Sequence, residues 1–467
     1  MALKGLDIFK LTPKTNCKDC GSPTCMAFAM KVAQGALPIS KCPHMAPEAL
    51  AKISEAAEPP MKTVEVGAGS DGAPPHKLGG ETVMFRHEKT LVHQNLYGVR
   101  IDADAARMDD AAIDATLAEA LGMDYERIGE RMYVECVYIV FTSDAARNRA
   151  VLQRVLAALD PGHAPNQGKS RVLLLECADA AAAAPLVEAA QGFKPVLCGA
   201  RAANWETMNA LASSKGLALG VGGATLEELH DTVEKLEAAG NKNLLLRLGD
   251  PAAPSAKDAF ASAVQIRRAA LKDQDRTFGY PSLVDLAALA PGDSVTQAAL
   301  AAVFTLRYGS IVILERMGYA EALPLYGLRQ NIFTDPQKPM KVTPGIYPIG
   351  GADEDALCCL TVDFALTYFV VSGEIERSGV PVNLLIPDAG GYSVLTAWAA
   401  GKLSASSVAK FIKEGGVEGV VKNRTLVIPG KVAVLKGELE ASLPGWEIVV
   451  GPNEAVQIVR FLKTLKR

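Results

Sequence analysis

Residues 133–176 read YVECVYIVFTSDAARNRAVLQRVLAALDPGHAPNQGKSRVLLLE, with two continuous apolar runs on either side of a helical pattern. The runs are 133–141 and 171–176, and the helical pattern covers 145–159. Strands that are apolar on both faces are typical of a parallel sheet that helices cover on each side. This stretch therefore predicts a strand–helix–strand unit with parallel strands.

The same alternation continues on both sides of this stretch, from about residue 81 to 321. The apolar runs are TVMFR (82–86), YGVRID (97–102), YVECVYIVF (133–141), RVLLLE (171–176), PVLCG (195–199), LALGVG (217–222), NLLLRLG (243–249) and IVILER (311–316). Eight such runs predict a TIM (β/α)8 barrel. Two spacings fit poorly: the first two runs leave no room for a helix, and the gap from 249 to 311 can hide a further strand. A doubly wound sheet therefore stays open as an alternative.

Two further domains flank the predicted barrel. Residues 1–60 hold a cysteine cluster and a helical stretch over 46–58, and the Pro- and Gly-rich segment 61–80 predicts a linker with a short strand at most. After a connector at 322–343, a second α/β unit extends to residue 467. Its apolar runs are LCCLTV (357–362), VNLLIP (382–387), GVVK (419–422), TLVIPG (425–430) and WEIVVG (446–451). They predict an open, Rossmann-like α/β sheet.

The composition excludes several functional classes. The formal net charge is −4 over 467 residues, so the chain lacks the basic field that nucleic acids or anionic lipids require. No apolar run reaches the ~18 residues of a membrane helix, and the N-terminus lacks a signal-peptide core. We therefore expect a cytoplasmic protein that binds neither nucleic acid nor membrane.

Four of the nine cysteines fall in one short segment, as Cys17-x2-Cys20-x4-Cys25-x16-Cys42. Four thiolates suit either zinc or a 4Fe–4S cluster. Structural zinc prefers two matched C-x2-C pairs, whereas here three ligands share one loop and the fourth is distant. This asymmetry favours a 4Fe–4S cluster that passes single electrons, with zinc as the alternative. The other cysteines lie in apolar runs and are predicted to be buried free thiols: Cys136, Cys177, Cys198, Cys358 and Cys359.

Glycine-bearing loops follow three strands of the C-terminal unit, at PDAGGYS (387–393), PGK (429–431) and GPNEA (451–455). Open α/β sheets bind ligands at the carboxyl ends of their strands, and glycine allows the backbone to approach a bulky ligand closely. Thr361 and Thr367 flank another strand end, where each could hydrogen-bond a ligand or cap the next helix. All six histidines precede residue 231, so this unit offers no imidazole to a metal.

Carboxylates also stand at or near the ends of predicted barrel strands, where the active sites of such barrels lie. They are Asp102, Glu176, Asp250 and Glu315. None has a histidine partner or a catalytic motif nearby in the sequence, so we assign no catalytic residue.

One family combines these features. The segment N-C-x2-C-G-x-P-T-C-x-A-F-A with K-C-P at Cys42 resembles the large (gamma) subunit of the corrinoid/iron–sulfur protein of the acetyl-CoA decarbonylase/synthase system. The resemblance continues over the full chain, in FRHEKT, NIFTDPQKPMKVTPGIYPIG, FALTYFVVSGEIE and VLTAWAAGK. It implies a cluster domain, a central TIM barrel and a C-terminal corrinoid-binding domain.

The resemblance also implies a function. The cobalt of a corrinoid, held without a histidine below the metal, would accept a methyl group from a methyltetrahydropterin through a methyltransferase and deliver it to acetyl-CoA synthase. A 4Fe–4S cluster on Cys17, Cys20, Cys25 and Cys42 would reactivate Co(II) to Co(I). The implied partners are a small subunit, the methyltransferase, acetyl-CoA synthase, and a reductive activator or ferredoxin. The corrin contacts would be Thr361, Thr367, Gly391, Tyr392, Ser393, Val394 and Ala455.

Two other functions remain possible from the sequence. One is a barrel pterin methyltransferase with an attached cluster, which needs a polar site at the barrel mouth, for example around Asp102 or Asp250. The other is a reductive activator that carries the cluster alone and docks on a separate corrinoid protein.

Overall fold

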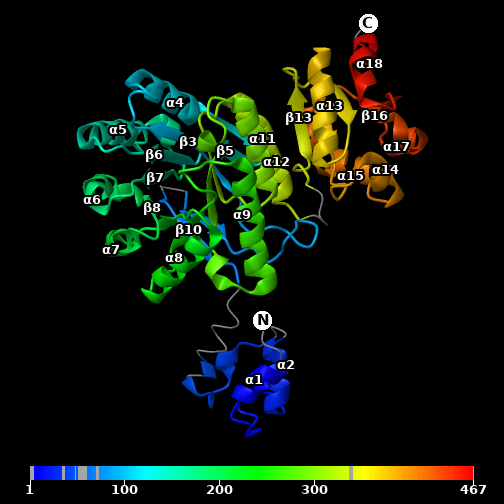
Figure 1. The fold of residues 1–467 in the computed structure, drawn as a ribbon. Coiled ribbons are helices and arrows are strands. Elements are labelled where there is room, and N and C mark those ends of the chain that lie inside the picture. The colour runs from blue at the N-terminus through cyan, green and yellow to red at the C-terminus, as the bar shows by residue number, and fades with distance from the viewer. Residues whose placement is uncertain are drawn as a thin grey trace. The chain divides into compact units, whose positions relative to one another are not determined.

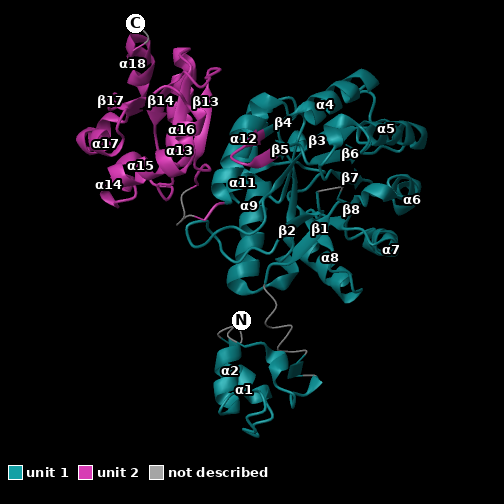
Figure 2. Cartoon of the chain, turned by 180° about the vertical axis from the view of Figure 1, so that it is seen from behind, with its two compact units in different colours: residues 1–125, 132–333 teal, residues 126–131, 334–467 magenta. Residues whose placement is uncertain are grey.

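The computed structural model describes residues 5–33, 37–47, 49–50, 60–69, 73–335 and 340–465 (Figure 1). Two compact units, Met1–Tyr125 with Met132–Phe333 and Glu126–Arg131 with Thr334–Arg467, are coloured separately in Figure 2. Within the described ranges, no helix is both long enough and apolar enough to cross a bilayer. Most of the helix expected over 46–58 lies outside the described residues.

The first unit contains a closed barrel of eight parallel strands, in the order β3-β6-β7-β8-β9-β10-β11-β12 with β12 pairing back onto β3. The strands are β3 (Leu96–Asp102), β6 (Cys136–Val140), β7 (Val172–Glu176), β8 (Val196–Ala200), β9 (Leu219–Val221), β10 (Leu244–Arg247), β11 (Ser282–Asp285) and β12 (Ile311–Leu314). The predicted TIM barrel is thus confirmed, and the doubly wound alternative is wrong for this unit.

Two strand assignments within the barrel differ from the prediction. Residues 82–86 form no strand, because the Glu88 carboxylate accepts hydrogen bonds from the backbone N–H of Met84 and Phe85 and holds a turn. The eighth strand is instead β11, which lies in the gap between 249 and 311. Its four residues begin with Ser282 and end with Asp285, so they form no continuous apolar run in the sequence.

Helices follow the strands and surround the barrel (Figure 1). They are α4 (Asp110–Gly122), α5 (Ala145–Ala158), α6 (Ala180–Ala189), α7 (Trp205–Lys215), α8 (Leu226–Ala238), α9 (Ala256–Arg268), α10 (Leu286–Leu289), α11 (Ser294–Leu306) and α12 (Tyr319–Ile332). Most begin at a residue whose side-chain oxygen accepts from a first-turn N–H. These caps are Asp109, Asp144, Asp179, Thr225, Ser255, Asp285 and Asp293. Each supplies about 1 kcal/mol and fixes where the helix starts.

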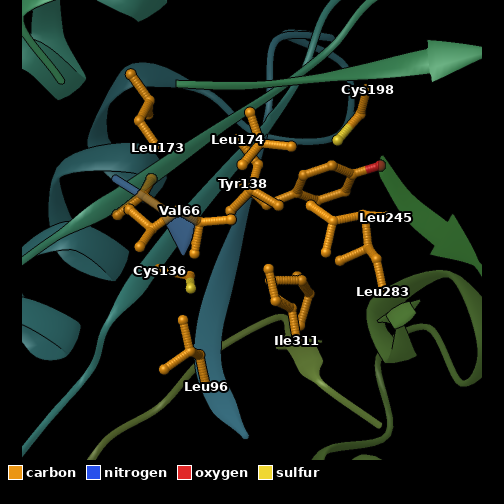
Figure 3. Packing of buried hydrophobic residues seen from close by; sticks show 14 of the residues in the cluster. Val66, Leu96, Cys136, Tyr138, Leu173, Leu174, Cys198, Leu245, Leu283 and Ile311 are labelled. Carbon is orange, nitrogen blue, oxygen red and sulfur yellow. The ribbon is translucent and has the colours of Figure 1, made fainter. Parts of the chain in front are cut away.

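The interior of the barrel is filled by side chains from its strands. Figure 3 shows Tyr138 and Leu174 among Cys136, Cys198 and Ile311, all of them buried. Burial raises the pKa of the Cys136 and Cys198 thiols, which keeps both protonated and inert. Cys177, Cys358 and Cys359 are likewise buried and free, so the prediction for all five outlying cysteines is confirmed.

The segment 61–80, expected to be a linker, is largely part of the first unit's core. It forms an antiparallel ribbon of β1 (Thr63–Val66) and β2 (His76–Gly79). Val64, Val66 and Leu78 join the barrel's buried cluster. The ribbon contacts loops that precede barrel strands, since the Lys62 N–H donates to the Gly279 carbonyl. It therefore covers the amino ends of the strands.

The second unit is a five-stranded sheet in the order β13-β15-β14-β16-β17, in which only β13 is antiparallel to its neighbour. The strands are β13 (Gly345–Ile349), β14 (Leu357–Leu360), β15 (Val382–Ile386), β16 (Thr425–Ile428) and β17 (Glu447–Val450). The helices are α13 (Ala365–Ser378), α14 (Val394–Ala399), α15 (Ala405–Glu414), α16 (Val417–Val420), α17 (Lys436–Ser442) and α18 (Ile458–Leu465). The expected open α/β sheet is confirmed, although the run at 419–422 is not a strand and β13 was not predicted.

Both faces of this sheet are covered, which explains its continuous apolar strands. Leu385 packs into a buried cluster on one face with residues of α15 and α17. Its neighbours Leu384 and Ile386 point to the other face, into a cluster that includes residues of α13 and α18. Ile128, in the turn of the hairpin β4 (Asp124–Arg127) and β5 (Glu130–Tyr133), packs against this second cluster.

The N-terminal segment contains α1 (Gly5–Leu11), α2 (Cys25–Ala33) and a 3-10 turn at Ile39–Lys41. A small buried cluster joins them, with Ile8, Phe28 and Ala29 packed beside Cys20 and Cys42. Such a small core has little stability of its own, so a bound metal group would contribute to folding here.

Candidate functional site

The four cysteines of the N-terminal segment lie in a loop, at a helix start and after a turn, and Cys20 and Cys42 share one buried cluster. Cys17 and Cys20 lie in a loop in which Asn16, Lys18 and Gly21 adopt positive φ angles of 50°, 70° and 73°. Cys25 is the first residue of α2. Cys42 directly follows the turn at Ile39–Lys41.

Polar groups around these sulfurs suit an iron–sulfur cluster. The backbone N–H of Asn16 donates to Cys25 Sγ over 3.4 Å, the kind of bond that tunes cluster potentials. Ser22 is 1% exposed, and its hydroxyl has no partner among the described residues, so a cluster sulfur could accept from it. Among the described residues, no three of the four Sγ atoms lie within 4.8 Å of one another. Zinc with ~2.3 Å bonds would hold them closer.

Asp19 and His44 bridge the two halves of this cysteine loop. Asp19 Oδ2 lies 2.6 Å from His44 Nε2, and both residues are about half exposed. The hydrogen bonds with His44 and with Cys17 lower the pKa of Asp19. The pair ties the segment of Cys17 and Cys20 to the segment that follows Cys42.

The second unit contains a cavity of about 330 Å³ at the carboxyl ends of its strands. Residues of α13 and α18 line it, with apolar side chains such as Val371 and Phe461, and so does the start of α14. The loops after β14, β16 and β17 form its edge. Leu366 and Leu395, which also line it, are 63% and 47% exposed. The mouth is thus apolar and would be covered by a ligand larger than the cavity.

The structure brings most of the predicted corrin contacts to this cavity. Those that line it are Thr361, Thr367, Ser393, Val394 and Ala455. Gly391 and Tyr392 do not line it; they lie in the loop that leads to Ser393. Whether any of these residues contacts a corrin stays a prediction.

Several lining residues gave no recognisable signal in the sequence. The wall formed by α18 reads only as an amphipathic helix, and within the predicted PGK loop no pattern singled out Lys431 itself. Lys431 Nζ lies 3.1 Å from Glu454 Oε1, which joins the loops after β16 and β17 at the cavity edge. A Cβ at Gly430 would lie 2.6 Å from the Gly451 carbonyl oxygen. Glycine in the PGK loop is therefore needed for the approach of the neighbouring loop.

Thr361 is the most distinctive polar residue of the cavity. It is 1% exposed, and its hydroxyl has no hydrogen-bond partner among the described residues. A buried hydroxyl without a partner costs about 1–3 kcal/mol. A ligand that hydrogen-bonds to it would recover this cost, which makes the cavity a candidate binding site.

The mouth of the barrel, by contrast, is filled by ion pairs. Arg100 pairs with Asp102 at 2.9 Å and with Asp285 at 2.7 Å, and Arg247 pairs with Glu176 at 2.7 Å. The space among the surrounding strand ends is about 10 Å³, room for no more than one water. Of the other carboxylates, Asp250 lies 3.8 Å from Arg201, and Glu315 accepts from the Gly292 N–H. The acids expected near strand ends are thus engaged with neighbouring groups.

Comparison with known proteins separates the cysteine segment from the rest of the chain. The family described as "CO dehydrogenase/acetyl-CoA synthase delta subunit" matches residues 63–462, and the one described as "Putative Fe-S cluster" matches residues 13–44. The corrinoid/iron-sulfur protein large subunit of Moorella thermoacetica is 38% identical over 99% of both chains. The acetyl-CoA decarbonylase/synthase complex subunit gamma of Methanothermobacter thermautotrophicus is 30% identical over 100% of this chain and 99% of its own.

Among solved structures, 7,8-dihydropteroate synthase from Vibrio fischeri covers 51% of this chain and 92% of its own, with a TM-score of 0.36 and 10% identity. That likeness is too distant to bear on function. The match to the two full-length relatives spans the cysteine loop, the barrel and the second α/β unit together. The chain therefore belongs to the family of corrinoid/iron–sulfur protein large subunits, which includes the gamma subunits of acetyl-CoA decarbonylase/synthase complexes.

Proposed function

We propose that this chain is a methyl carrier that takes a methyl group from a methyltetrahydropterin, through a separate methyltransferase, and delivers it to acetyl-CoA synthase. The observation that carries the proposal is the cavity with the unpartnered Thr361 hydroxyl, in a histidine-free α/β unit. The name of the Moorella relative states a corrinoid and an iron–sulfur group. The cavity is where this chain would hold the corrinoid.

Within this proposal, the chain's own residues bind and shield the corrinoid. Val371 and Phe461 exclude water from the buried part of the ligand, and Thr361 offers it one hydrogen bond at depth. The exposed apolar rim at Leu366 and Leu395 supports the part that extends beyond the cavity. The bound corrinoid supplies a cobalt that carries the methyl group, and no histidine of the second unit can ligate it.

The N-terminal cysteines would hold a 4Fe–4S cluster through Cys17, Cys20, Cys25 and Cys42. Such a cluster supplies single electrons at potentials that extend down to roughly −700 mV, low enough to restore an oxidised corrinoid. The Asn16 N–H donates to Cys25 Sγ and would help to hold that ligand in place. The proposed partners are a small subunit, the methyltransferase, acetyl-CoA synthase, and a reductive activator or ferredoxin.

The two alternatives have less support. A barrel that itself binds a pterin needs an open polar site at the mouth, and the ion pairs of Arg100 and Arg247 occupy that position. A cluster-only activator would have no use for a cavity of about 330 Å³ with an unpartnered hydroxyl.

Metal analysis of the anaerobically purified full-length chain, with and without a co-expressed small subunit, tests the proposal. We expect about four irons and one cobalt per chain in the complex. Four irons with no cobalt in either sample would contradict the methyl-carrier function and favour the cluster-only activator.

Replacing Thr361 by valine should have opposite effects on the cobalt-free and the corrinoid-bound chain. Without the corrinoid, removal of an unpartnered buried hydroxyl should leave the second unit equally stable or about 1 kcal/mol more stable. With the corrinoid, loss of the hydrogen bond should weaken retention by about 5- to 100-fold. Calorimetric unfolding of the cobalt-free chain measures the change in stability. Visible absorbance after dialysis measures how much corrinoid the loaded chain retains.

Thr232→Val is the matched control for this experiment. Thr232 is 0% exposed, and its hydroxyl donates to the Glu228 carbonyl over 2.7 Å. The same substitution there removes a satisfied hydroxyl, so it should lower stability and leave corrinoid retention unchanged. Unchanged corrinoid retention in Thr361→Val would contradict the role of Thr361 in ligand binding.

A further inference from the structure

Asp363 is a buried carboxylate at the edge of the cavity that neither the sequence pattern nor the family match singles out. It follows β14, between the cavity-lining residues Thr361 and Thr367, and it is 0% exposed. Its own side chain does not line the cavity. Any effect it has on a ligand must therefore act through the residues it contacts.

The contacts of Asp363 are with the loop that follows β15. The N–H groups of Ala389 and Gly391 donate to Asp363 Oδ1 over 3.1 Å and 3.0 Å. The intervening N–H of Gly390 donates to Asp388 Oδ1 over 3.0 Å. Three consecutive amides thus point at carboxylates. Such a run of amides forms a concave anion site, and here the chain's own Asp363 and Asp388 occupy it.

This loop cannot take its conformation from local preference alone. Gly390 and Gly391 have φ angles of +74° and +76°, in the left-handed region that glycine visits but does not favour over other conformations. Two residues later the chain reaches Ser393 and Val394, which begin α14 and line the cavity. The hydrogen bonds to Asp363 therefore set where this wall of the cavity lies relative to Thr361.

The arrangement is costly, which argues that it serves more than folding. Asp363 Oδ2 has no hydrogen-bond partner among the described residues, and its nearest cation, Lys341 Nζ, is 3.8 Å away. Burial raises the pKa of this carboxyl group. A buried, half-satisfied carboxylate destabilises a fold, and such features persist mainly where a site depends on them.

We propose that Asp363 is the positioning residue of the corrinoid cavity, because one buried carboxylate ties the Thr361 wall to the loop that carries Ser393 and Val394. The inference rests on the proposed function, since it assumes that the ligand of the cavity is the corrinoid. Asp363 itself need not touch that ligand.

The test compares Asp363→Ala with Asp363→Asn in the full-length chain co-expressed with the small subunit. Asparagine keeps an oxygen that can accept from both amides, whereas alanine removes it. In the cobalt-free Asp363→Ala chain, hydrogen exchange of a peptide covering 387–393 should accelerate about 10-fold or more. Its cobalt content after anaerobic purification should fall by more than half, and Asp363→Asn should restore both readouts toward wild type.

Asp353→Ala is the control, because Asp353 is exposed and accepts from the Asp355 N–H in the loop before β14. It should change neither readout. If Asp363→Ala does not fold, Gly391→Ala strains the same loop from its own side and should lower cobalt content in a folded chain.

Three results would count against these ideas. Faster exchange with unchanged cobalt would overturn the positioning role, because the loop would then be irrelevant to the ligand. Equal cobalt loss in Asp363→Asn and Asp363→Ala would also overturn it, because charge and not the shared hydrogen bonds would matter. A wild-type chain without cobalt would overturn the proposed function instead, while the exchange data would still report whether Asp363 holds the loop.

Discussion

Replacing Cys20 by alanine is expected to remove nearly all of the iron from the purified chain while its cobalt stays bound. Cys20 is 7% exposed and packs beside Cys42 in the small N-terminal core. Loss of Cys20 would leave one iron of the cube without its protein ligand, which weakens retention of the cluster by this small segment. Iron should fall from about four per chain to less than one, and the broad brown absorbance and the low-temperature EPR signal of the reduced cluster should disappear.

Cys177→Ala is the matched control, because Cys177 is 8% exposed and lies far from the cluster segment in the sequence. It should keep all of its iron. Full iron content in Cys20→Ala would show that Cys20 is not a ligand. Loss of cobalt together with the iron would contradict the assignment of the two groups to separate parts of the chain.

Replacing Arg329 by methionine should destabilise the barrel by about 3–5 kcal/mol, because it leaves a buried carboxylate without its cation. Arg329 Nη1 lies 2.7 Å from Glu135 Oε1, and each residue is 3% exposed. The other oxygen of Glu135 accepts from the Tyr97 N–H and the Tyr326 hydroxyl. The free energy of unfolding of the barrel alone can be measured in urea, with hydrogen exchange of peptides from β6 and β7 as the signal.

Two further variants separate the charge from the packing. Adding Glu135→Gln to Arg329→Met should recover much of the loss, because the uncompensated charge is gone. Arg154→Met, which breaks partly exposed pairs with Asp110 and Asp114, should cost less than about 1 kcal/mol. A loss in Arg329→Met no larger than that in Arg154→Met would contradict a structural role for the buried pair.

The limits of prediction in the two α/β units follow from strand length and position. The barrel was predictable because its long strands, such as β6, are apolar without interruption. β11 begins with Ser282 and ends in Asp285, so its apolar run is too interrupted to be read as a buried strand. β13 contains Pro348 and pairs with only one neighbour, as edge strands with proline do. Its residues therefore read as part of the connector.

The two candidate sites also differ in how much of each could be predicted from the sequence. The cysteine spacing predicts a metal group directly, because Cys17, Cys20 and Cys25 lie within one short stretch of the sequence. The pairing of Asp19 with His44 joins residues 25 positions apart and has no local pattern. In the second unit, glycine loops and threonines at strand ends pointed to a ligand site, while Asp363 was one acidic residue among many.

By itself, the sequence determined the parallel barrel, the open α/β unit and the absence of histidine from that unit, and it predicted the cysteine ligand set. The spacing of the cysteines and the periodicity of the apolar residues are properties of short segments, so they can be recognised without knowing how distant segments pack. Only the tertiary structure decided that ion pairs fill the barrel mouth, that Thr361 has an unpartnered hydroxyl in a cavity, and that Asp363 holds the loop at 389–391. Each of these is a contact between segments distant in the chain, so it exists only once the strands and helices have packed.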